Sequence, residues 1–480
     1  MSQGFLRQID KAAFSPTCAK YGRLLPPPLI GGGVDSEVEL RNLGFAMLER
    51  DGLPSIGNDK IPAAYTYFGQ FIDHDLTLDL VSTFEAEIDP PATRNFRTAA
   101  LELDSLYGLG PHGSPFLYCQ RSLDRFRLGE VRNATRAGEL ELDLPRLEDG
   151  TALIADPRND ENLLVSQLTV AFLRLHNRFA AEQPEKDWRD RHKAAKQLLR
   201  WHYQWVVLND YLPRIVGKQL VEDLLNGHRR LYDPLDEAQE AFIPVEFSAA
   251  AFRFGHSQIR ASYAINADTQ GQVPTFPATR SPDPFALPDV TKPRPSLQGG
   301  PVRQRDVVDW SLLVGGGERV QKSLRIGPRL SEPLRALPFD VLRDSPKQGV
   351  LAVRNLMRGA ALRLPDGRAA AMFAAALIST SEIRPLDEAQ IWSSFEQYRL
   401  AEVPLWFYIL REAEVHGDEG RRLAGLGARI VAETIVGVLQ KDPRSILGDG
   451  KRFAPSETLL HGGKFDLEAL LRAADMPFSG

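Results

Sequence analysis

The chain contains 480 residues, of which 43% are hydrophobic and 25% are charged. This composition is typical of a globular protein and excludes a disordered, collagenous or disulfide-framework chain. The net charge of −5, from 58 basic and 63 acidic residues, provides no basic field for nucleic acid or an anionic membrane. We therefore expect a protein that acts on small molecules.

Cys18 and Cys119 are the only cysteines, too few to hold an iron–sulfur cluster or a structural zinc ion through thiolates. The first residues lack the apolar core of a secretory signal, and no stretch approaches the roughly 18 apolar residues of a membrane span. From this we expect a cytoplasmic location, with leaderless secretion as the alternative. No heptad stripe or interface pattern indicates an oligomeric state.

Two irregular stretches stand out along the chain. The first 35 residues contain the runs Pro26–Pro28 and Gly31–Gly33, which predict an extended N-terminal arm on a domain formed by residues 36–480. The proline density from Pro274 to Pro295 predicts a long ordered loop. No polar linker with a shift of composition and no internal repeat is present, so we expect one large domain.

Elsewhere apolar residues recur mainly at helical spacing, and alternating strand patterns are short and scattered. The clearest stripe predicts a helix of about 20 residues and consists of Leu164, Leu168, Ala171, Phe172, Leu175 and Phe179. Similar periodicity occurs in Asp187–Leu224, Ala369–Ile378, Leu423–Leu439 and Leu467–Ala474. The predicted fold class is mainly α.

A polar cluster lies in the segment AYTYFGQFIDHDLTLDL, residues Ala64–Leu80, which we predict to be a helix entered after Pro62. Asp75 points away from His74 on such a helix. The helix is too apolar to be wet on all sides, so some of its acids need a metal, an arginine or a covalent bond as partner. The alternative is a hydrogen-bonded histidine flanked by solvated acids. The residues that share one helical face are Gln70, Asp73, His74 and Thr77.

A second cluster, DPRNDE, precedes the helix that contains LHNR and places Arg158 on its entering turn. Glu161 suits a helix start because the helix dipole favours a carboxylate there. His176 borders the apolar stripe, and we interpret it as a structural histidine.

A third cluster, AFRFGH, lies in an aromatic stretch rich in small residues. A neutral His256 there is either a hydrogen-bonded core residue or an axial ligand to iron, and Gly255 would allow a flat group to approach closely.

Taken together, FGQFIDHD, DPRNDE followed by LHNR, AFRFGH and the later LAVRNLMR resemble the ordered motifs of the animal-type haem peroxidases. That superfamily includes myeloperoxidase, lactoperoxidase and the cyclooxygenases. The motifs span Gln70 to Arg358, and the chain resembles a bacterial-style member without a leader or appended modules. The resemblance implies a helical domain with buried haem b. It also implies a peroxidase that reduces hydrogen peroxide and oxidises small organic or (pseudo)halide donors through a ferryl intermediate.

The same resemblance places Gln70, His74 and Arg158 on the distal side of the haem as catalytic residues. His74 would carry the proton from one oxygen of the peroxide to the other. Arg158 would stabilise negative charge on the leaving oxygen, and Gln70 would hold a distal water or a halide.

On the opposite side, the resemblance implies that His256 binds the haem iron. Asn355 would accept a hydrogen bond from the other ring nitrogen of His256, and Arg253 would bind a haem propionate. Asp73 and Glu161 match the two acids that form ester bonds to haem methyl groups in mammalian relatives. Asn162 replaces the methionine that forms a third link in myeloperoxidase, so no third link is expected.

The resemblance also implies a calcium ion bound by Asp75 and by the loop RTAALELDSLYG. The other ligands at the family's spacing are Thr98, the carbonyl of Ala100, Glu102 and Asp104, all oxygen donors suited to calcium. Glu102 and Asp104 stand where mammalian relatives carry aspartate and serine, so the coordination geometry is expected to differ.

Three alternatives compete with the peroxidase interpretation. A fatty-acid oxygenase of the same superfamily needs a tyrosine three positions before the proximal histidine, where this chain has Arg253. A metal-dependent hydrolase would bind zinc or iron through His74, Asp73 or Asp75, and His176, but it leaves AFRFGH unexplained. A catalytically idle haem-binding or adhesion protein would have no need for His74 and Arg158 together.

Overall fold

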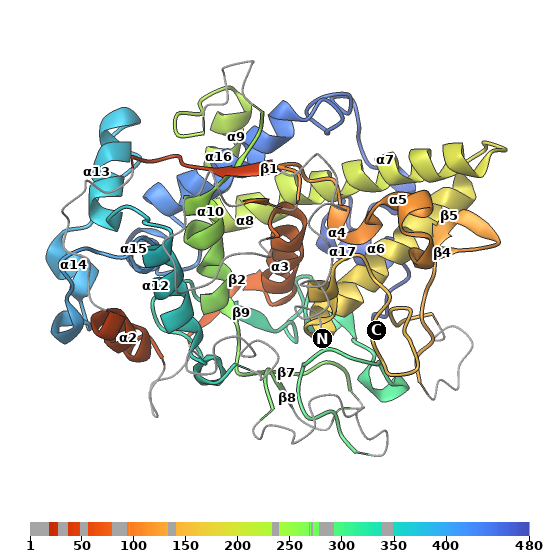
Figure 1. Cartoon of the computed structure of the whole chain (residues 1–480), viewed down its shortest axis with the longest axis horizontal. Coiled ribbons are helices and arrows are strands. Elements are labelled where there is room, and N and C mark those ends of the chain that lie inside the picture. Colours follow the sequence, from red (N-terminus) through yellow and green to blue (C-terminus); the bar gives the residue numbers. More distant parts are fainter. Residues whose placement is uncertain are drawn as a thin grey trace.

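The structure is a computed structural model that describes residues 19–26, 37–48, 56–78, 94–95, 97–132, 141–232, 240–267, 269, 272–277, 292–337 and 349–479. Within these residues the fold is mainly helical with short strands, which confirms the predicted class (Figure 1). Cys18 lies outside the described residues, and Cys119 is a free cysteine.

The α-helices are α2 (Glu37–Ala46), α3 (Ala64–Leu76), α4 (Asp104–Tyr107), α5 (Gly110–Gly113), α6 (Leu163–Glu182), α7 (Trp188–Val206), α8 (Leu212–Val216), α9 (Lys218–Leu225), α10 (Val245–Ala249), α12 (Leu351–Ala361), α13 (Gly367–Leu377), α14 (Glu388–Trp392), α15 (Leu405–His416), α16 (Gly425–Lys441) and α17 (Leu467–Ala473). The 3₁₀ helices are η2 (Pro115–Leu117), η4 (Pro157–Asp160), η6 (Ala251–Gln258), η7 (Gln304–Asp306), η8 (Trp310–Leu312), η9 (Glu332–Arg335), η10 (Glu396–Tyr398) and η11 (Glu457–Leu459), and η5 (Val207–Tyr211) is a π-helix. The strands are β1 (Ala19–Gly22), β2 (Gly57–Pro62), β3 (Arg94–Asn95), β4 (Tyr118–Cys119), β5 (Ser122–Phe126), β6 (Ile243–Pro244), β7 (Ser262–Tyr263), β8 (Val273–Pro274) and β9 (Lys322–Leu324).

Helix α3 lies in the middle of the molecule (Figure 1), where its apolar side chains are buried. The ring of Phe71 stacks on Phe172 of α6 with 4.5 Å between centroids, an arrangement that adds to the burial of apolar area. The sequence predicted that this helix would extend to Leu80. It ends at Leu76, because Thr77 adopts an extended conformation. The N–H of Leu78 then donates to Oδ1 of Asn95 instead of continuing the helix.

Helix α6 has the predicted length of 20 residues, and the whole predicted apolar stripe is buried. Asn162 caps its N-terminus because Oδ1 of Asn162 accepts a hydrogen bond from the N–H of Val165, at 2.9 Å. The helix packs against α3 and α7, and α6 and α7 run side by side in Figure 1. The first turn of α6 is thereby held beside the polar face of α3.

The region from Asp187 to Leu224, which has one helical periodicity in the sequence, forms several elements. Helix α7 passes into the π-helix η5, and α8 ends at Gly217, which has a left-handed φ of 92°. A glycine adopts this conformation without steric cost. The periodicity therefore predicted the buried face correctly but not the breaks.

The described part of the N-terminal arm contributes β1, which is the central strand of a three-stranded sheet in the order β3-β1-β6. Strand β1 runs antiparallel to β3 and parallel to β6, with Tyr21 opposite Ile243. The buried carboxylate of Glu246 accepts hydrogen bonds from the N–H groups of Leu24 and Leu25, at 3.1 and 3.2 Å. This segment is thus fixed to α10, next to the element that carries the AFRFGH motif.

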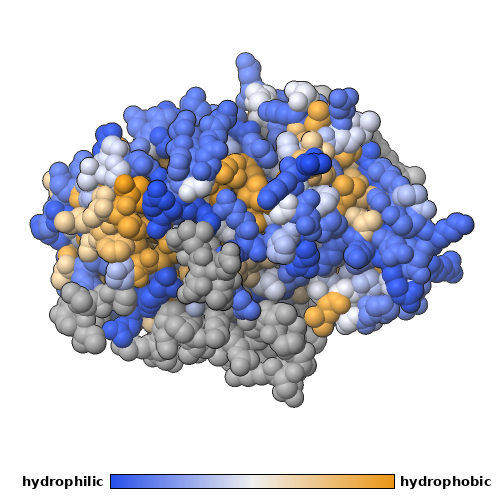
Figure 2. All heavy atoms as spheres, turned by 90° about the horizontal axis from the view of Figure 1, so that it is seen from above, coloured by the Kyte–Doolittle hydropathy of each residue, from blue (hydrophilic) through white to orange (hydrophobic). Residues whose placement is uncertain are grey.

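The remaining strands form three two-stranded antiparallel pairs, β2 with β9, β4 with β5 and β7 with β8. Most of the predicted proline-rich loop, residues 278–291, lies outside the described residues, as do residues 1–18 and 27–36. The face shown in Figure 2 is largely hydrophilic with scattered apolar patches. Among the described helices, none is long and apolar enough to cross a membrane.

We predict that Glu246→Gln loosens the segment around Leu24 and Leu25, because only one carboxylate oxygen is left for two N–H donors. A hydrogen bond to a charged group contributes about 1.5–3 kcal/mol, and cleavage of the Arg23–Leu24 bond by trypsin requires local opening. Limited proteolysis should therefore cut this bond roughly tenfold faster in the variant. Glu240→Gln, at an exposed position nearby, is the control, and equal rates for Glu246→Gln and the unmodified chain would contradict the assigned role.

Candidate active site

The structure brings the second polar cluster onto the polar face of α3. The Nδ1 atom of His74 lies 2.8 Å from Oδ1 of Asn159, in η4. The Nη2 atom of Arg158 donates to the backbone carbonyls of His74, at 3.0 Å, and Thr77, at 2.7 Å. Burial, followed by the nearby Arg158 cation, lowers the pKa of His74 to about 3. His74 is therefore a neutral imidazole at any physiological pH.

Asp156 holds this arrangement together. Its buried carboxylate accepts from Nε and Nη2 of Arg158, at 3.1 and 2.7 Å, and from Nη2 of Arg97. Arg97 in turn donates through Nε to the carbonyl of His74, at 3.2 Å. Burial alone would raise the pKa of Asp156, but Arg158 and Arg97 outweigh it and keep this pKa well below the usual range. The carboxylate is thus permanently charged and orients both arginines.

Arg158 is left with one nitrogen for another partner. Its Nε and Nη2 atoms are occupied by Asp156 and by backbone carbonyls, whereas Nη1 has no hydrogen bond to the described part of the chain. Opposite charges on Asp156, Asp73 and Glu161 keep the pKa of Arg158 above its usual value, although burial opposes them. Arg158 is therefore a fixed cation with one free N–H edge.

Gln70 lies between two residues at the start of α6. Its Oε1 accepts from Nδ2 of Asn162, at 3.0 Å, and its Nε2 donates to Oε2 of Glu161, at 3.3 Å. Both ends of the Gln70 amide are thus occupied. A water or halide at this position would have to compete with Glu161 for the amide N–H.

The two acids predicted to form ester bonds, Asp73 and Glu161, lie in this same group. Thr77 donates from Oγ1 to Oδ1 of Asp73, at 3.1 Å. Burial raises the pKa of Asp73, with Arg158 and Arg253 opposing the shift. Burial also raises the pKa of Glu161 to about 7. Both carboxyl groups therefore take up a proton more readily than an acid in water.

The third cluster forms the 3₁₀ helix η6, which packs against α3. Burial, followed by the Arg253 cation, lowers the pKa of His256 to about 3, so this imidazole is neutral as well. Tyr211 lies between the two elements, with its ring in edge contact with Phe68 of α3 and Phe252 of η6. The two histidines therefore lie on neighbouring elements, one on each.

Asn355 of α12 contacts His256, but in the opposite sense to the prediction. Its Nδ2 faces Nδ1 of His256 at 2.8 Å, because its Oδ1 accepts from Nη1 of Arg253 at 2.9 Å. We therefore correct the predicted direction, since an amide nitrogen can only donate. A neutral ring whose Nδ1 accepts keeps its proton on Nε2. For Nε2 to bind a metal, the Asn355 amide would have to turn and Arg253 would have to release it.

Arg253 is bound by protein groups in the structure. Besides Asn355, its Nε donates to the carbonyl of Ser248, at 3.0 Å. Burial lowers the pKa of Arg253 to about 10, and the neighbouring arginines Arg358 and Arg354 add to the shift, whereas Asp73 opposes it. The guanidinium therefore remains charged and lies beside other cations, which is an environment suited to an anion.

His74 and Asn355 are buried, whereas six other residues predicted to surround a cofactor keep some solvent exposure although their elements are central. Phe71, Ile72 and Phe254 on the same elements are buried. Apart from the adjoining backbone, no atom of the described residues lies within 4 Å of the position that a Cβ on Gly255 would take. Glu161 is exposed by surface area, yet protein surrounds its carboxyl closely enough to shift its pKa. This combination is expected for side chains that face a space within the protein. The partly or fully accessible residues are Gln70, Asp73, Arg158, Glu161, Arg253 and His256.

On the other side of α3, Asp75 is completely buried, and neither of its carboxylate oxygens has a hydrogen-bond partner in the part of the chain that the structure describes. Burial raises the pKa of Asp75 to about 7, and the negative charge of Asp104 is the next largest cause of this shift. Thr98 is close as well, with Oγ1 at 3.4 Å from Oδ2 of Asp104. Ala100, whose carbonyl was predicted to bind the ion, lies buried in the same loop.

Glu102 lies in the same group and shares the hydroxyl of Thr98 with Asp104, but its carboxylate is already paired with two arginines. Its Oε2 accepts from Nη2 of Arg200, at 2.5 Å, and of Arg444, at 2.9 Å, and its Oε1 accepts from Thr98. We therefore remove Glu102 from the predicted ligand set. Within the described residues, no group of three or more histidine, cysteine, aspartate or glutamate side chains is arranged to hold a metal ion. A cation here would depend on two carboxylates, a hydroxyl group and backbone carbonyls.

His176 is structural, as the sequence predicted. Its Nδ1 pairs with the hydroxyl of Tyr107 and its Nε2 with the carbonyl of Asp124, each at 2.8 Å. Both ring nitrogens are thereby occupied. The hydrolase interpretation, which used His176 as a metal ligand, is therefore contradicted.

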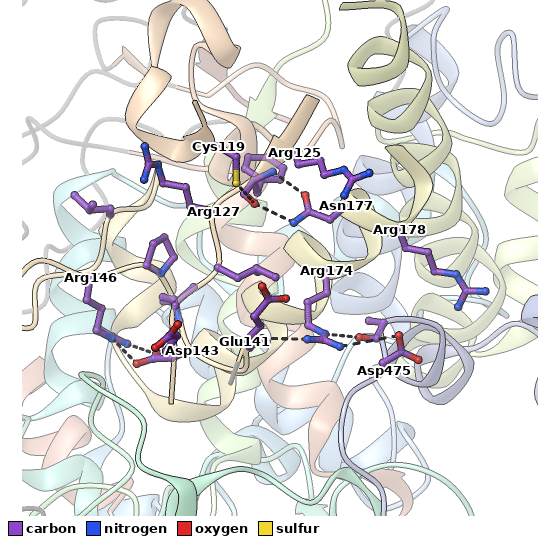
Figure 3. A pocket seen from close by; sticks show the side chains of 18 of the residues that line it. Cys119, Arg125, Arg127, Glu141, Asp143, Arg146, Arg174, Asn177, Arg178 and Asp475 are labelled. Carbon is purple, nitrogen blue, oxygen red and sulfur yellow. Dashed lines mark hydrogen bonds and ion pairs between the residues drawn. The ribbon is translucent and has the colours of Figure 1, made fainter. Parts of the chain in front are cut away.

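A pocket of about 790 Å³ lies away from this site, beside the C-terminal half of α6 (Figure 3). Its arginines are held mainly by the protein. Arg174 donates to the carbonyl of Ala474 at 2.8 Å, and Arg178 to that of Ala473 at 2.9 Å. These arginines satisfy carbonyls at the C-terminal end of α17, a place where cations are favoured.

Sequence reasoning did not identify three residues that organise the site. Asp156 and Asn159 lie within the DPRNDE motif, so the signal was present, but Arg158 and Glu161 alone were selected from it. Arg97 precedes the predicted calcium loop and had no distinguishing pattern. Its contact with Asp156 joins positions 59 residues apart in the chain.

Known proteins resemble this chain in sequence and in fold. Residues 117–297 match the family described as animal haem peroxidase. The chain is 32% identical over 216 residues to the peroxidasin homolog of Mus musculus, which covers 43% of this chain and 13% of that protein. It is 28% identical over 169 residues to thyroid peroxidase of Homo sapiens, covering 34% of this chain and 15% of that protein. The chain thus matches only a small part of these curated relatives.

The fold is shared over much more of the chain. Peroxidase A from Dictyostelium discoideum superposes with a TM-score of 0.64 and 15% identity over 97% of this chain and 95% of that one. Fatty acid alpha-dioxygenase of Oryza sativa superposes with a TM-score of 0.57 and 14% identity, over 95% of this chain and 79% of that one. The family match and the curated relatives support an animal-type haem peroxidase, and the solved structures show that the chain shares the fold of such a peroxidase and of a fatty acid alpha-dioxygenase.

Proposed function

We propose that the chain is a haem peroxidase that reduces hydrogen peroxide to water and oxidises a small organic or (pseudo)halide donor. The observation that carries this proposal is the distal pair, a neutral His74 beside the permanently charged Arg158. The overall change takes two electrons from the donor and two protons, and yields two water molecules from each peroxide.

Two residues supply the acid–base and electrostatic parts of this reaction. His74 accepts the proton of the peroxide oxygen that becomes bound and returns it to the oxygen that leaves, so hydroxide is never released. Arg158, with Nη1 unoccupied, donates to the leaving oxygen as negative charge develops on it. Because Asp156 fixes Arg158 before the reaction, no reorganisation is needed at that moment.

The residues on both elements fit a haem group once the Asn355 amide turns to accept from Nδ1 of His256 and Arg253 releases it. His256 would bind its iron, Arg253 and its cationic neighbours would bind a propionate, and Asp73 and Glu161 would form the ester bonds. The haem group, when bound, supplies the redox centre that cleaves the O–O bond. The partial exposure of these residues and the open space at Gly255 support this assignment.

A calcium ion beside α3 is part of the same proposal. The two unpaired oxygens of Asp75 are the supporting observation, because a buried carboxylate without a partner is costly. We propose that Asp75, Asp104, Thr98 and the carbonyl of Ala100 hold it. Calcium prefers such oxygen ligands.

The fold similarity to fatty acid alpha-dioxygenase makes a lipid oxygenase the second candidate. That candidate lacks a phenol three positions before His256, and the residue there, Arg253, cannot form a tyrosyl radical. The peroxidase proposal needs no further residue.

The two histidines should have separable roles. We predict that His256→Ala abolishes stable haem incorporation, whereas His74→Ala retains haem but slows the reaction with peroxide by about 10²- to 10⁴-fold, as expected for loss of a general base. Haem content is measured by the pyridine haemochrome method and the rate by stopped-flow absorption. His461→Ala, at a half-exposed position, is the control. Normal haem content in His256→Ala would overturn the proximal assignment.

The low pKa of His74 predicts an unusual pH profile. Since the imidazole is protonated only near pH 3, the rate of the peroxide reaction should stay nearly constant from pH 8 down to about pH 5. It should fall only in stronger acid. The pKa of Glu161 lies near 7, so the profile is measured in parallel for Glu161→Gln. An acid limb near pH 6.5 in both proteins would contradict the assigned state of His74.

Calcium removal provides a test of the ligand set. We predict that chelation lowers the Tm of the unmodified chain by several degrees and that added calcium restores it. Asp75→Asn should lose this response, because a main oxygen donor is gone. Glu102→Gln should keep it, since the arginines already occupy that side chain. A calcium response that disappears in Glu102→Gln but persists in Asp75→Asn would show that the corrected ligand set is wrong.

A further inference from the structure

The hydrogen bond between His74 and Asn159 determines where the imidazole carries its proton. The Oδ1 atom of Asn159 can only accept, so at 2.8 Å from Nδ1 of His74 it requires the proton to be on Nδ1. The Nε2 atom is then left with a free lone pair. A general base needs an unprotonated nitrogen, and Nε2 of His74 is one.

The orientation of the Asn159 amide is itself fixed by the protein. Its Nδ2 donates to the backbone carbonyl of Ser105, at 3.3 Å, so the oxygen is turned toward His74. The backbone N–H of Asn159 donates to the carbonyl of Asp156, at 3.0 Å, within the turn of η4. Asn159 is completely buried. Turning the amide over would place its oxygen against the carbonyl of Ser105, which needs a donor, and its nitrogen against the protonated Nδ1 of His74, which needs an acceptor.

The neutrality of Asn159 matters as much as its position. The charged groups that face His74 are Arg97, from the loop before α4, and Asp156 and Arg158, at η4. Asp156 is already neutralised by both arginines. A carboxylate at position 159 would add an unpaired negative charge beside the ring and would favour its protonated form. An amide supports the neutral form and leaves it able to accept a proton.

We propose that Asn159 is a positioning residue that holds the proton on Nδ1 of His74 and so keeps Nε2 as the basic atom of the site. Its catalytic consequence rests on the proposed peroxidase function, whereas its effect on the imidazole does not. The family resemblance gives roles to Arg158 and Glu161 of the DPRNDE motif but none to Asn159.

The direct test is ¹⁵N NMR of the histidine rings in the haem-free chain, with the His74 signals identified by their loss in His74→Ala. The unmodified chain should show a single neutral form of His74 with its proton on Nδ1 from pH 5 to 8. Asn159→Ala should show a mixture of the two neutral forms. Asn159→Asp, which keeps the acceptor and the shape of the side chain, should retain the Nδ1 proton but become protonated at a clearly higher pH.

The haem-loaded proteins give the second readout. Asn159→Ala should slow the peroxide reaction roughly tenfold or more at every pH, because part of the population presents a protonated Nε2. Asn159→Asp should approach the unmodified rate at pH 8 and lose it in acid. Ser105→Ala is the matched control, since its hydroxyl is buried without a partner while its backbone carbonyl is retained.

These outcomes separate the two proposals. A single Nδ1-protonated form in Asn159→Ala would overturn the positioning role, as would a mixture of the two neutral forms in Asn159→Asp. If Asn159→Ala fails to fold, the isosteric Asn159→Asp still decides the question. A normal NMR result in a chain that does not react with peroxide would instead refute the proposed function and leave the role of Asn159 intact.

Discussion

The buried carboxylate of Asp156 is the interaction on which the geometry of the site depends. It binds Arg97 and Arg158, and both arginines donate to the same backbone carbonyl, that of His74. The C-terminal turn of α3, the loop that follows β3 and the helix η4 are thereby joined at one point. Without this carboxylate, two largely buried cations would face each other without compensation, and loss of one partner of a buried pair is strongly destabilising. Asp156 thus helps to fix the position of His74 through the two arginines that donate to its backbone carbonyl.

The electrostatics of the site follow from the same arrangement. Burial and neighbouring arginines hold both His74 and His256 in the neutral form. Burial also raises the pKa of Asp73, and it raises that of Glu161 to about 7. The fixed positive charge is confined to arginines. Charges that the fold has already fixed in place need no reorganisation to act on a bound group.

The sequence predicted those features that depend on local periodicity. The length and buried face of α6, and the division of α3 into a side with His74 and a side with Asp75, follow from residue spacing alone. The structural role of His176 was also evident from its position beside the apolar stripe.

The features that the sequence did not predict depend on partners distant in the chain. Glu102 pairs with Arg444, 342 residues away, so a cation would have to compete with that arginine for its carboxylate. The Asn355 amide is turned by Arg253, 102 residues away. Spacing within a motif indicates which residues are near one another, but it does not indicate which of two nearby donors an oxygen will accept from.

The central claim is that His74 and His256 lie on opposite sides of one haem, with His256 bound to its iron. Resonance Raman spectroscopy of the reduced protein, after titration with haemin, tests this claim most directly. The account predicts saturation at one haem per chain and an iron–histidine stretching band that shifts when the histidines are labelled with ¹⁵N. Unsaturable haemin binding, or a saturated protein without an isotope-sensitive iron–histidine band, would contradict it.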